Sequence, residues 1–229
     1  MSYKRIEKLS DLEIIIERDE NKQTKLALYV ANTFAGLGRV PIQDAELFAK
    51  NLQEYQVNLM IDPSSKLVLN TLREMIEIPN AHVLFAVFSH GTQVKDTNSG
   101  SPSTHRYLDE SDGYDEAIVM KDGLIIDDTI TYIVNKYRKC KKLTLIADIC
   151  HSTIFDYKDY KNKDNLTILT ACADHQTSKQ LSKNGVFTMQ FWNCYNKHTG
   201  VLNVNELGRR LSLFDQTPQI YPFTSQITF

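Results

Sequence analysis

The sequence predicts one α/β domain over residues 1–229, built on a mainly parallel sheet of six strands with helices on both faces. Short apolar runs bounded by Gly, Pro and Asp alternate along the chain with segments whose apolar residues recur at helical spacing. No internal repeat, linker or low-complexity block divides the chain, and 229 residues with 42% hydrophobic content can bury one sizeable core. We therefore expect a single domain, with residues 1–22 as an N-terminal extension.

Six segments are predicted as strands because each is a short apolar run that ends at turn-forming residues. A further short β segment is expected at 116–120, before a turn at 121–123. The polar stretch 92–111, which contains Gly, Ser and Pro, is predicted to be a long loop. In chain order the six sheet strands span residues 25–30, 56–61, 83–88, 143–147, 166–171 and 219–223, the last of them at an edge.

Helices are predicted between these strands, where apolar residues recur every three or four positions. The first follows Asp44, the second starts after a turn at 62–65 and stops near Pro79, and the third begins at Asp127 and Asp128. The apolar faces consist of Ala45, Leu47, Phe48 and Leu52; Val68, Leu69, Leu72 and Ile76; Ile130, Ile133, Val134 and Tyr137; Phe187, Gln190, Phe191 and Cys194; and Val204, Leu207 and Leu211.

Composition and charge narrow the class of protein. The net charge of −2 does not indicate nucleic-acid binding. No apolar stretch approaches the roughly 18 residues of a membrane span. The polar N-terminus lacks the apolar segment of a signal peptide. Four widely spaced cysteines without a C-x-x-C pair indicate free thiols, three of them as packing residues. We expect a cytoplasmic protein that contacts neither nucleic acid nor membrane.

A histidine and a cysteine follow two of the predicted strands. Strand 83–88 runs into Ser89-His90-Gly91, and strand 143–147 runs into Asp148-Ile149-Cys150-His151-Ser152. The carboxyl ends of parallel strands share one edge of a sheet, where α/β proteins place their chemistry. A catalytic thiol also needs a nearby base. The pattern therefore predicts Cys150 as a nucleophile with His90 as its partner.

The predicted chemistry is acyl transfer. Cys150 attacks a carbonyl, His90 protonates the leaving amine, and the backbone N–H groups of Gly91 and Cys150 bind the oxyanion. His151 is a poorer partner, because neighbouring side chains on an extended segment point to opposite sides. An activated Cys150 is expected to react with iodoacetamide well below pH 8.5.

These residues carry a resemblance to the metacaspases, the caspase-like cysteine peptidases. The resemblance covers nearly the whole chain, and it implies a caspase-like three-layer sandwich, a cysteine endopeptidase activity and a monomer. The segments that are similar to the family are Leu26-Ala27-Leu28-Tyr29-Val30 with Asp44-Ala45, Ser89-His90-Gly91, Asp112-Gly113-Tyr114-Asp115-Glu116, Asp127-Asp128, Asp148-Ile149-Cys150-His151-Ser152 and Ala171-Cys172-Ala173-Asp174-His175-Gln176-Thr177-Ser178.

Carboxylates beside the nucleophile predict a basic residue before the scissile bond. Asp148 lies two residues before Cys150, on the same side of an extended strand end, and Asp174 follows the next strand. Such carboxylates would pair with Arg or Lys at P1, as the resemblance also implies. The Q-A-C-x-G signature of caspases is absent. Phe88 stands where the family has a small polar residue that lines the basic pocket.

The resemblance also implies calcium and self-processing. Asp115, Asp127, Asp128 and Asp156 match the positions of the family's calcium ligands, and calcium prefers several converging oxygens. With basic specificity, lysines in the polar loop after Cys150 are candidate self-cleavage positions. These are Lys158, Lys161 and Lys163.

Two other classes of function stay open. Phe88, together with Thr153 in place of the family's glycine, favours a catalytically inactive caspase-like module that binds a protein partner or peptide. An unrelated doubly wound binding protein is disfavoured, because no Gly-rich phosphate loop follows the first strand.

Overall fold

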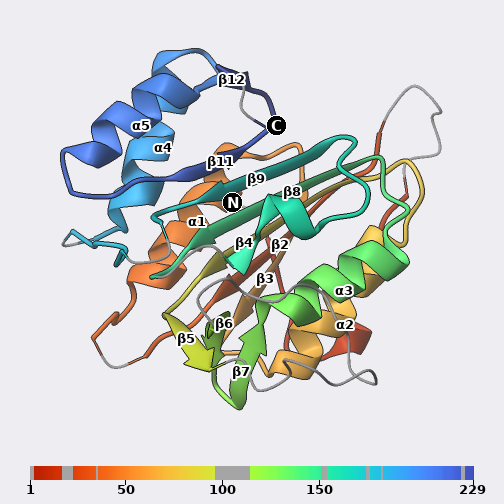
Figure 1. Cartoon of the computed structure of the whole chain (residues 1–229). Coiled ribbons are helices and arrows are strands. Elements are labelled where there is room, and N and C mark those ends of the chain that lie inside the picture. The colour runs from red at the N-terminus through yellow and green to blue at the C-terminus, as the bar shows by residue number, and fades with distance from the viewer. Residues whose placement is uncertain are drawn as a thin grey trace.

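A central sheet of seven strands is covered by helices on both faces (Figure 1). The computed structural model describes residues 3–16, 23–34, 36–95, 114–150, 154–173, 176–181, 183–222 and 225–229. Every neighbouring pair is parallel except the last, which is antiparallel. In spatial order the strands are β1 (Lys4–Arg5), β3 (Gln56–Ile61), β2 (Lys25–Ala31), β4 (His82–Phe88), β8 (Lys142–Asp148), β9 (Leu166–Thr170) and β11 (Gln219–Tyr221).

Each face of the sheet has its own apolar cluster, and this makes three layers. On one face lie α2 (Ser65–Ile76) and α3 (Asp127–Tyr137), and on the other lie α1 (Val40–Asn51), α4 (Val186–Lys197) and α5 (Val204–Ser212). Because both faces are buried, the inner strands read as continuous apolar runs rather than as alternating ones. All six predicted strands and all five predicted helices are present.

The seventh strand comes from the segment predicted as an N-terminal extension. β1 pairs with β3, and Ile6 directly after it is 2% exposed and donates its N–H to the Leu59 carbonyl at 2.9 Å. Sequence patterning misses this strand because it has two residues, both of them charged and exposed. The extension is therefore partly built into the core.

A small antiparallel sheet projects beyond the carboxyl end of β4. It consists of β5 (Gly91–Lys95), β6 (Tyr114–Met120) and β7 (Gly123–Ile126). The prediction of a continuous loop over 92–111 is wrong at its start, since residues 92–95 pair with β6, and the rest of that stretch lies outside the described residues. Because β5 starts immediately after His90, this sheet fixes the chain on the far side of the histidine.

The remaining described elements are short. β10 (Leu202–Asn203) pairs with β12 (Gln226–Ile227), and the 3-10 turns η1 (Leu9–Asp11) and η3 (Tyr157–Asp159) lie in connections. None of the helices in the described ranges is long and apolar enough to cross a membrane.

Candidate active site

The register of the sheet brings His90 and Cys150 to the same edge. β4 and β8 are adjacent and parallel, and their last paired residues are Phe88 and Asp148. His90 and Cys150 each lie two residues beyond this pair. Both are half-buried, and both line one pocket. The strand ends thus deliver a thiol and an imidazole at matching positions.

The two backbone segments predicted for the oxyanion lie in direct contact. A Cβ atom placed on Gly91 would lie 1.8 Å from the carbonyl oxygen of Cys150 and 3.2 Å from the Ile149 side chain. Only glycine fits at such a distance, because real Cβ atoms do not approach a backbone oxygen that closely. Gly91 therefore allows the histidine turn to lie flat against the cysteine turn.

The Cys150 thiol lies near the backbone carbonyl of Ser178, with 3.9 Å between Sγ and the oxygen. Burial raises the pKa of the Cys150 thiol, and the charge of Asp148 acts in the same direction, while the Ser178 carbonyl contact lowers the pKa. The net direction is upward. This contradicts the expected low-pKa thiol, and the physical reason is desolvation at the strand end.

A pocket of about 160 Å³ opens beside Cys150 and His90. The helix α1, the ends of β4 and β8, and the segment 178–185 enclose it. Its apolar wall is Leu37, Val40, Pro41 and Phe88, and its other lining residues are Asp44, Ser89, His90, Asp148, Cys150, Ser178, Lys179, Gln180 and Gly185.

Asp148 lies in the wall of this pocket but is only 8% exposed. Its Oδ1 accepts a hydrogen bond from Ser178 Oγ at 2.7 Å, and its Oδ2 accepts from Thr188 N at 3.2 Å and Thr188 Oγ1 at 2.9 Å. Burial raises the pKa of Asp148, and these hydrogen bonds oppose the rise. The predicted substrate carboxylate thus also anchors the first turn of α4.

Asp44 is a second buried carboxyl group in the pocket. The sequence predicts it as the residue before the first helix, but α1 begins at Val40, so Asp44 lies inside the helix. It is 2% exposed and accepts hydrogen bonds from Asn184 Nδ2 at 2.7 Å and from Gly185 N at 2.9 Å. Burial first, and then the charge of Asp148, raise the pKa of Asp44 to about 8. A Cβ atom on Gly185 would lie 2.4 Å from Asp148 Oδ2 and 3.1 Å from Asp44 Oδ2, so this glycine separates two neighbouring carboxyl groups.

Phe88 lines the pocket without offering it a polar group. Its side chain is 1% exposed, and its ring packs against Phe48 with 5.4 Å between centroids. Phe88 therefore contributes an apolar side chain to the wall of the pocket.

Some predicted site residues cannot be placed. Asp174 and His151, like Thr153, lie outside the described residues.

The four predicted calcium ligands are not assembled into a ligand set. Among the described residues, no group of three or more His, Cys, Asp and Glu side chains could hold a metal ion. Asp156 instead accepts a hydrogen bond from Lys158 N at 3.0 Å and an ion pair from Lys158 Nζ at 2.7 Å. Asp115 is buried on β6, whereas Asp127 and Asp128 start α3. Among the described residues, these four aspartates do not form a group of ligands around one point.

Comparison with known proteins adds a family model and a solved structure. The model described as "Caspase domain" matches residues 24–224. The crystal structure of protein GSU0716 from Geobacter sulfurreducens is similar with a TM-score of 0.63 and 18% sequence identity, covering 90% of this chain and 94% of that one. No curated protein matches the chain. At this identity the solved structure supports the fold alone, and it agrees with the three-layer α/β sandwich.

Proposed function

The chain belongs to the caspase domain family, and on that premise we propose that it is a metacaspase-like cysteine endopeptidase that cleaves polypeptides after Arg or Lys. The proposal rests above all on one observation. His90 and Cys150 extend the same register pair, beside a pocket that contains two carboxyl groups. Its described lining residues include one lysine, Lys179, whose Nζ pairs with Asp215 Oδ2 at 3.1 Å, and no arginine.

The raised thiol pKa determines how the reaction starts. Because burial keeps Cys150 protonated at neutral pH, His90 acts as a general base that takes the thiol proton while sulfur attacks the carbonyl carbon of the substrate. The same proton then passes from His90 to the leaving amine as the peptide bond breaks. Water attacks the thioester in the second half of the cycle, and its proton returns through His90 to sulfur.

The acidic pair explains the proposed specificity. A side chain that enters the pocket meets an apolar wall first, which suits the methylene stem of Arg or Lys. The cationic head then approaches Asp44 and Asp148. Two neighbouring buried carboxyl groups are costly when both are charged, and a guanidinium or ammonium group relieves that cost. An aspartate at P1 would add a third acid instead.

A peptide panel tests this proposal directly. We expect peptides with Arg or Lys at P1 to be cleaved at least 100-fold faster than the matched Asp peptide, with no cleavage by Cys150→Ala. Asp44→Asn should reduce the Arg rate through KM while leaving a neutral P1 peptide nearly unaffected. Faster cleavage after Asp contradicts the specificity. Equal inactivity of the wild type and Cys150→Ala on every peptide contradicts the peptidase.

The partial burial of the Cys150 thiol, which raises its pKa, favours the alternative of an inactive peptide-binding module. Such a module would bind the Arg peptide without cleaving it. Binding measured with the wild-type protein, followed by mass analysis of the peptide, separates the two functions.

Calcium activation and self-processing remain proposals that derive from the family resemblance. Peptidase activity measured in a chelator and in millimolar calcium tests calcium activation. Unchanged activity in the chelator would contradict it. For the second, fragments of the wild-type chain that end at Lys158, Lys161 or Lys163 should be absent from Cys150→Ala.

A further inference from the structure

A buried asparagine links the strand before the pocket to the histidine turn. Asn32 follows β2 and is fully buried. Its backbone N–H donates to the Phe88 carbonyl at 3.0 Å, so it continues the ladder between β2 and β4 by one residue beyond the strands. This places its side chain beside the turn that carries His90.

The side-chain amide of Asn32 bridges two elements. Its Nδ2 donates to Ser89 Oγ at 3.0 Å and to the Val119 carbonyl oxygen of β6 at 3.1 Å. Since a carbonyl oxygen can only accept, the Val119 contact fixes which end of the amide faces the turn. Asn32 therefore holds β4 and β6 together at one point.

Two further hydrogen bonds complete the connection to the histidine. Ser89 Oγ donates to the Val119 carbonyl at 2.9 Å, and the Val119 N–H donates to the His90 carbonyl at 2.9 Å. The chain is thus tied to β6 before the imidazole by the side chains of Asn32 and Ser89, and after it by the His90 carbonyl. Among the described residues, no hydrogen bond to the imidazole itself is found, so its position depends on this backbone and on the Phe34 ring, which lies 5.9 Å from it.

We propose that Asn32 is a positioning residue for the cysteine peptidase reaction, which fixes the His90 turn against β6 so that the imidazole stays in line with Cys150. This inference rests on the proposed function. Proton transfer between sulfur and imidazole requires hydrogen-bond distance, and a displacement of about 1 Å can cost about 100-fold in rate.

The test compares Asn32→Ala with a matched control, Asn58→Ala. Asn58 is also a buried asparagine, 2% exposed, on β3, and its amide lies 3.5 Å from the Gln56 carbonyl, away from the pocket. We expect kcat of Asn32→Ala to fall 10- to 100-fold with KM for the Arg peptide within about twofold, because Asp44 and Asp148 are untouched. Asn58→Ala should lose stability without this fall in kcat.

A second readout does not require peptidase activity. The His90 ring signal in the NMR spectrum, assigned by its loss in His90→Ala, should shift in Asn32→Ala and in the milder Ser89→Ala, but not in Asn58→Ala. An unshifted His90 signal, or a kcat equal to that of Asn58→Ala, overturns the positioning role. A wild-type chain that cleaves no peptide overturns the proposed function instead, while the His90 signal still decides the role of Asn32.

Discussion

At the scale of single residues, the site depends on glycines that no other residue can replace. Gly91 lies under the Cys150 carbonyl, and Gly185 lies between two carboxyl groups. In contrast, a Cβ atom on Gly208 in α5 would meet no atom within 4 Å. The same residue type is therefore required at the active site and dispensable on the helix surface.

We predict that Gly91→Ala lowers kcat/KM by at least 100-fold. The new methyl group would overlap the Cys150 carbonyl, so the two turns must separate and the oxyanion donors with them. Peptide cleavage and thermal unfolding measure the two effects. Gly208→Ala is the control, and it should stabilise α5 by up to about 1 kcal/mol with unchanged activity. Normal cleavage by Gly91→Ala would show that the contact between the turns is irrelevant to catalysis.

Asp44 leads to a prediction on pH. Its folded-state pKa of about 8 lies above the ordinary value, so the folded chain holds this proton more tightly than the unfolded chain. The associated stability is complete below about pH 4 and is lost as the pH rises towards 8. Because a cationic P1 side chain favours the ionised acid, binding of an Arg peptide should tighten over the same interval, by at most tenfold per pH unit.

Binding of the Arg peptide to the Cys150→Ala protein isolates this effect from catalysis. We expect the dissociation constant of the Cys150→Ala protein to fall from pH 6 to pH 8. In the double variant that also carries Asp44→Asn, the dissociation constant should be nearly independent of pH. A constant affinity across this range in the protein that retains Asp44 would show that Asp44 does not titrate there.

The sequence predicts some of these residues and not others for a physical reason. His90, Cys150 and Asp148 each follow or end an apolar run that can be recognised locally. The parallel pairing of β4 and β8 then brings these residues to the same edge of the sheet. Asp44 lies inside α1, where an acid is ordinarily a solvated residue. Its burial comes from Asn184 and Gly185, which are 140 and 141 positions away, and such a contact leaves no local pattern.

At the scale of elements, the segment before α4 is the part of the site that patterning described least well. No strand or helix is predicted for residues 179–185, and the structure shows antiparallel pairing there. Gln180 and Gly185 form an isolated antiparallel bridge, and the Val186 N–H donates to the Lys179 carbonyl at 2.8 Å. Gln180 Nε2 also reaches the Gly36 carbonyl at 3.1 Å. Tertiary contacts hold this hairpin, namely those to Asp44 of α1 and to the Gly36 carbonyl before α1. The sequence of the hairpin alone therefore does not predict it.

Residues of the hairpin also line the pocket, and Gly185→Ala tests this role. A methyl group at this position must displace Asp148, whose two oxygens are held by Ser178 and Thr188. We expect a destabilisation of about 1–3 kcal/mol and a rise in KM for Arg peptides of at least tenfold. Urea unfolding and steady-state kinetics measure both. Unchanged KM would mean that the hairpin is not part of the P1 subsite.

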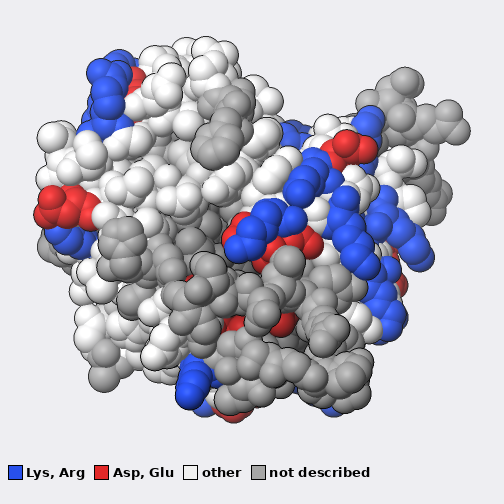
Figure 2. Space-filling model, viewed as in Figure 1, with Lys and Arg blue, Asp and Glu red and all other residues white. Residues whose placement is uncertain are grey.

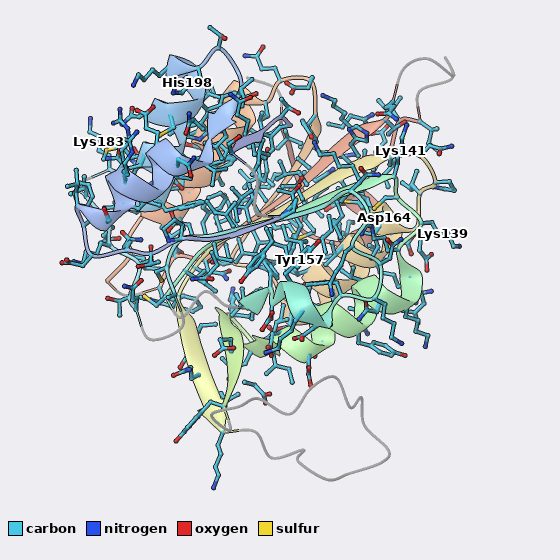
Figure 3. All side chains as sticks on the ribbon, turned by 45° about the horizontal axis from the view of Figure 1, so that its top comes forward. Lys139, Lys141, Tyr157, Asp164, Lys183 and His198 are labelled. Carbon is cyan, nitrogen blue, oxygen red and sulfur yellow. The ribbon has the colours of Figure 1, made fainter. Side chains whose placement is uncertain are left out.

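At the scale of the whole molecule, lysines lie around the amino-terminal end of β8, opposite the pocket. Basic side chains gather on one side of the surface in Figure 2, and Lys139 and Lys141 lie on that side in Figure 3. Both precede β8, whereas Asp148 ends it, about 20 Å away along the strand. The pocket that contains Asp44 and Asp148 thus opens at the other end of β8 from these two lysines, and Lys179 is a lining residue of the pocket itself.

The extent of the folded unit is the other property of the whole molecule. The family match begins at residue 24, yet Ile6 belongs to the same apolar cluster as α2 and α3, and β1 lengthens the sheet. We predict that Ile6→Ala destabilises the protein by about 2–4 kcal/mol, as for other buried aliphatic truncations. Ile15→Ala is the matched control, since Ile15 is 63% exposed and its loss should change stability by no more than about 0.5 kcal/mol. Urea unfolding of both variants measures the two changes in stability. If Ile6→Ala is as stable as Ile15→Ala, the segment before residue 24 lies outside the cooperative unit. If Ile6→Ala is less stable, the core that supports His90 and Cys150 includes a strand that lies outside the matched residues 24–224.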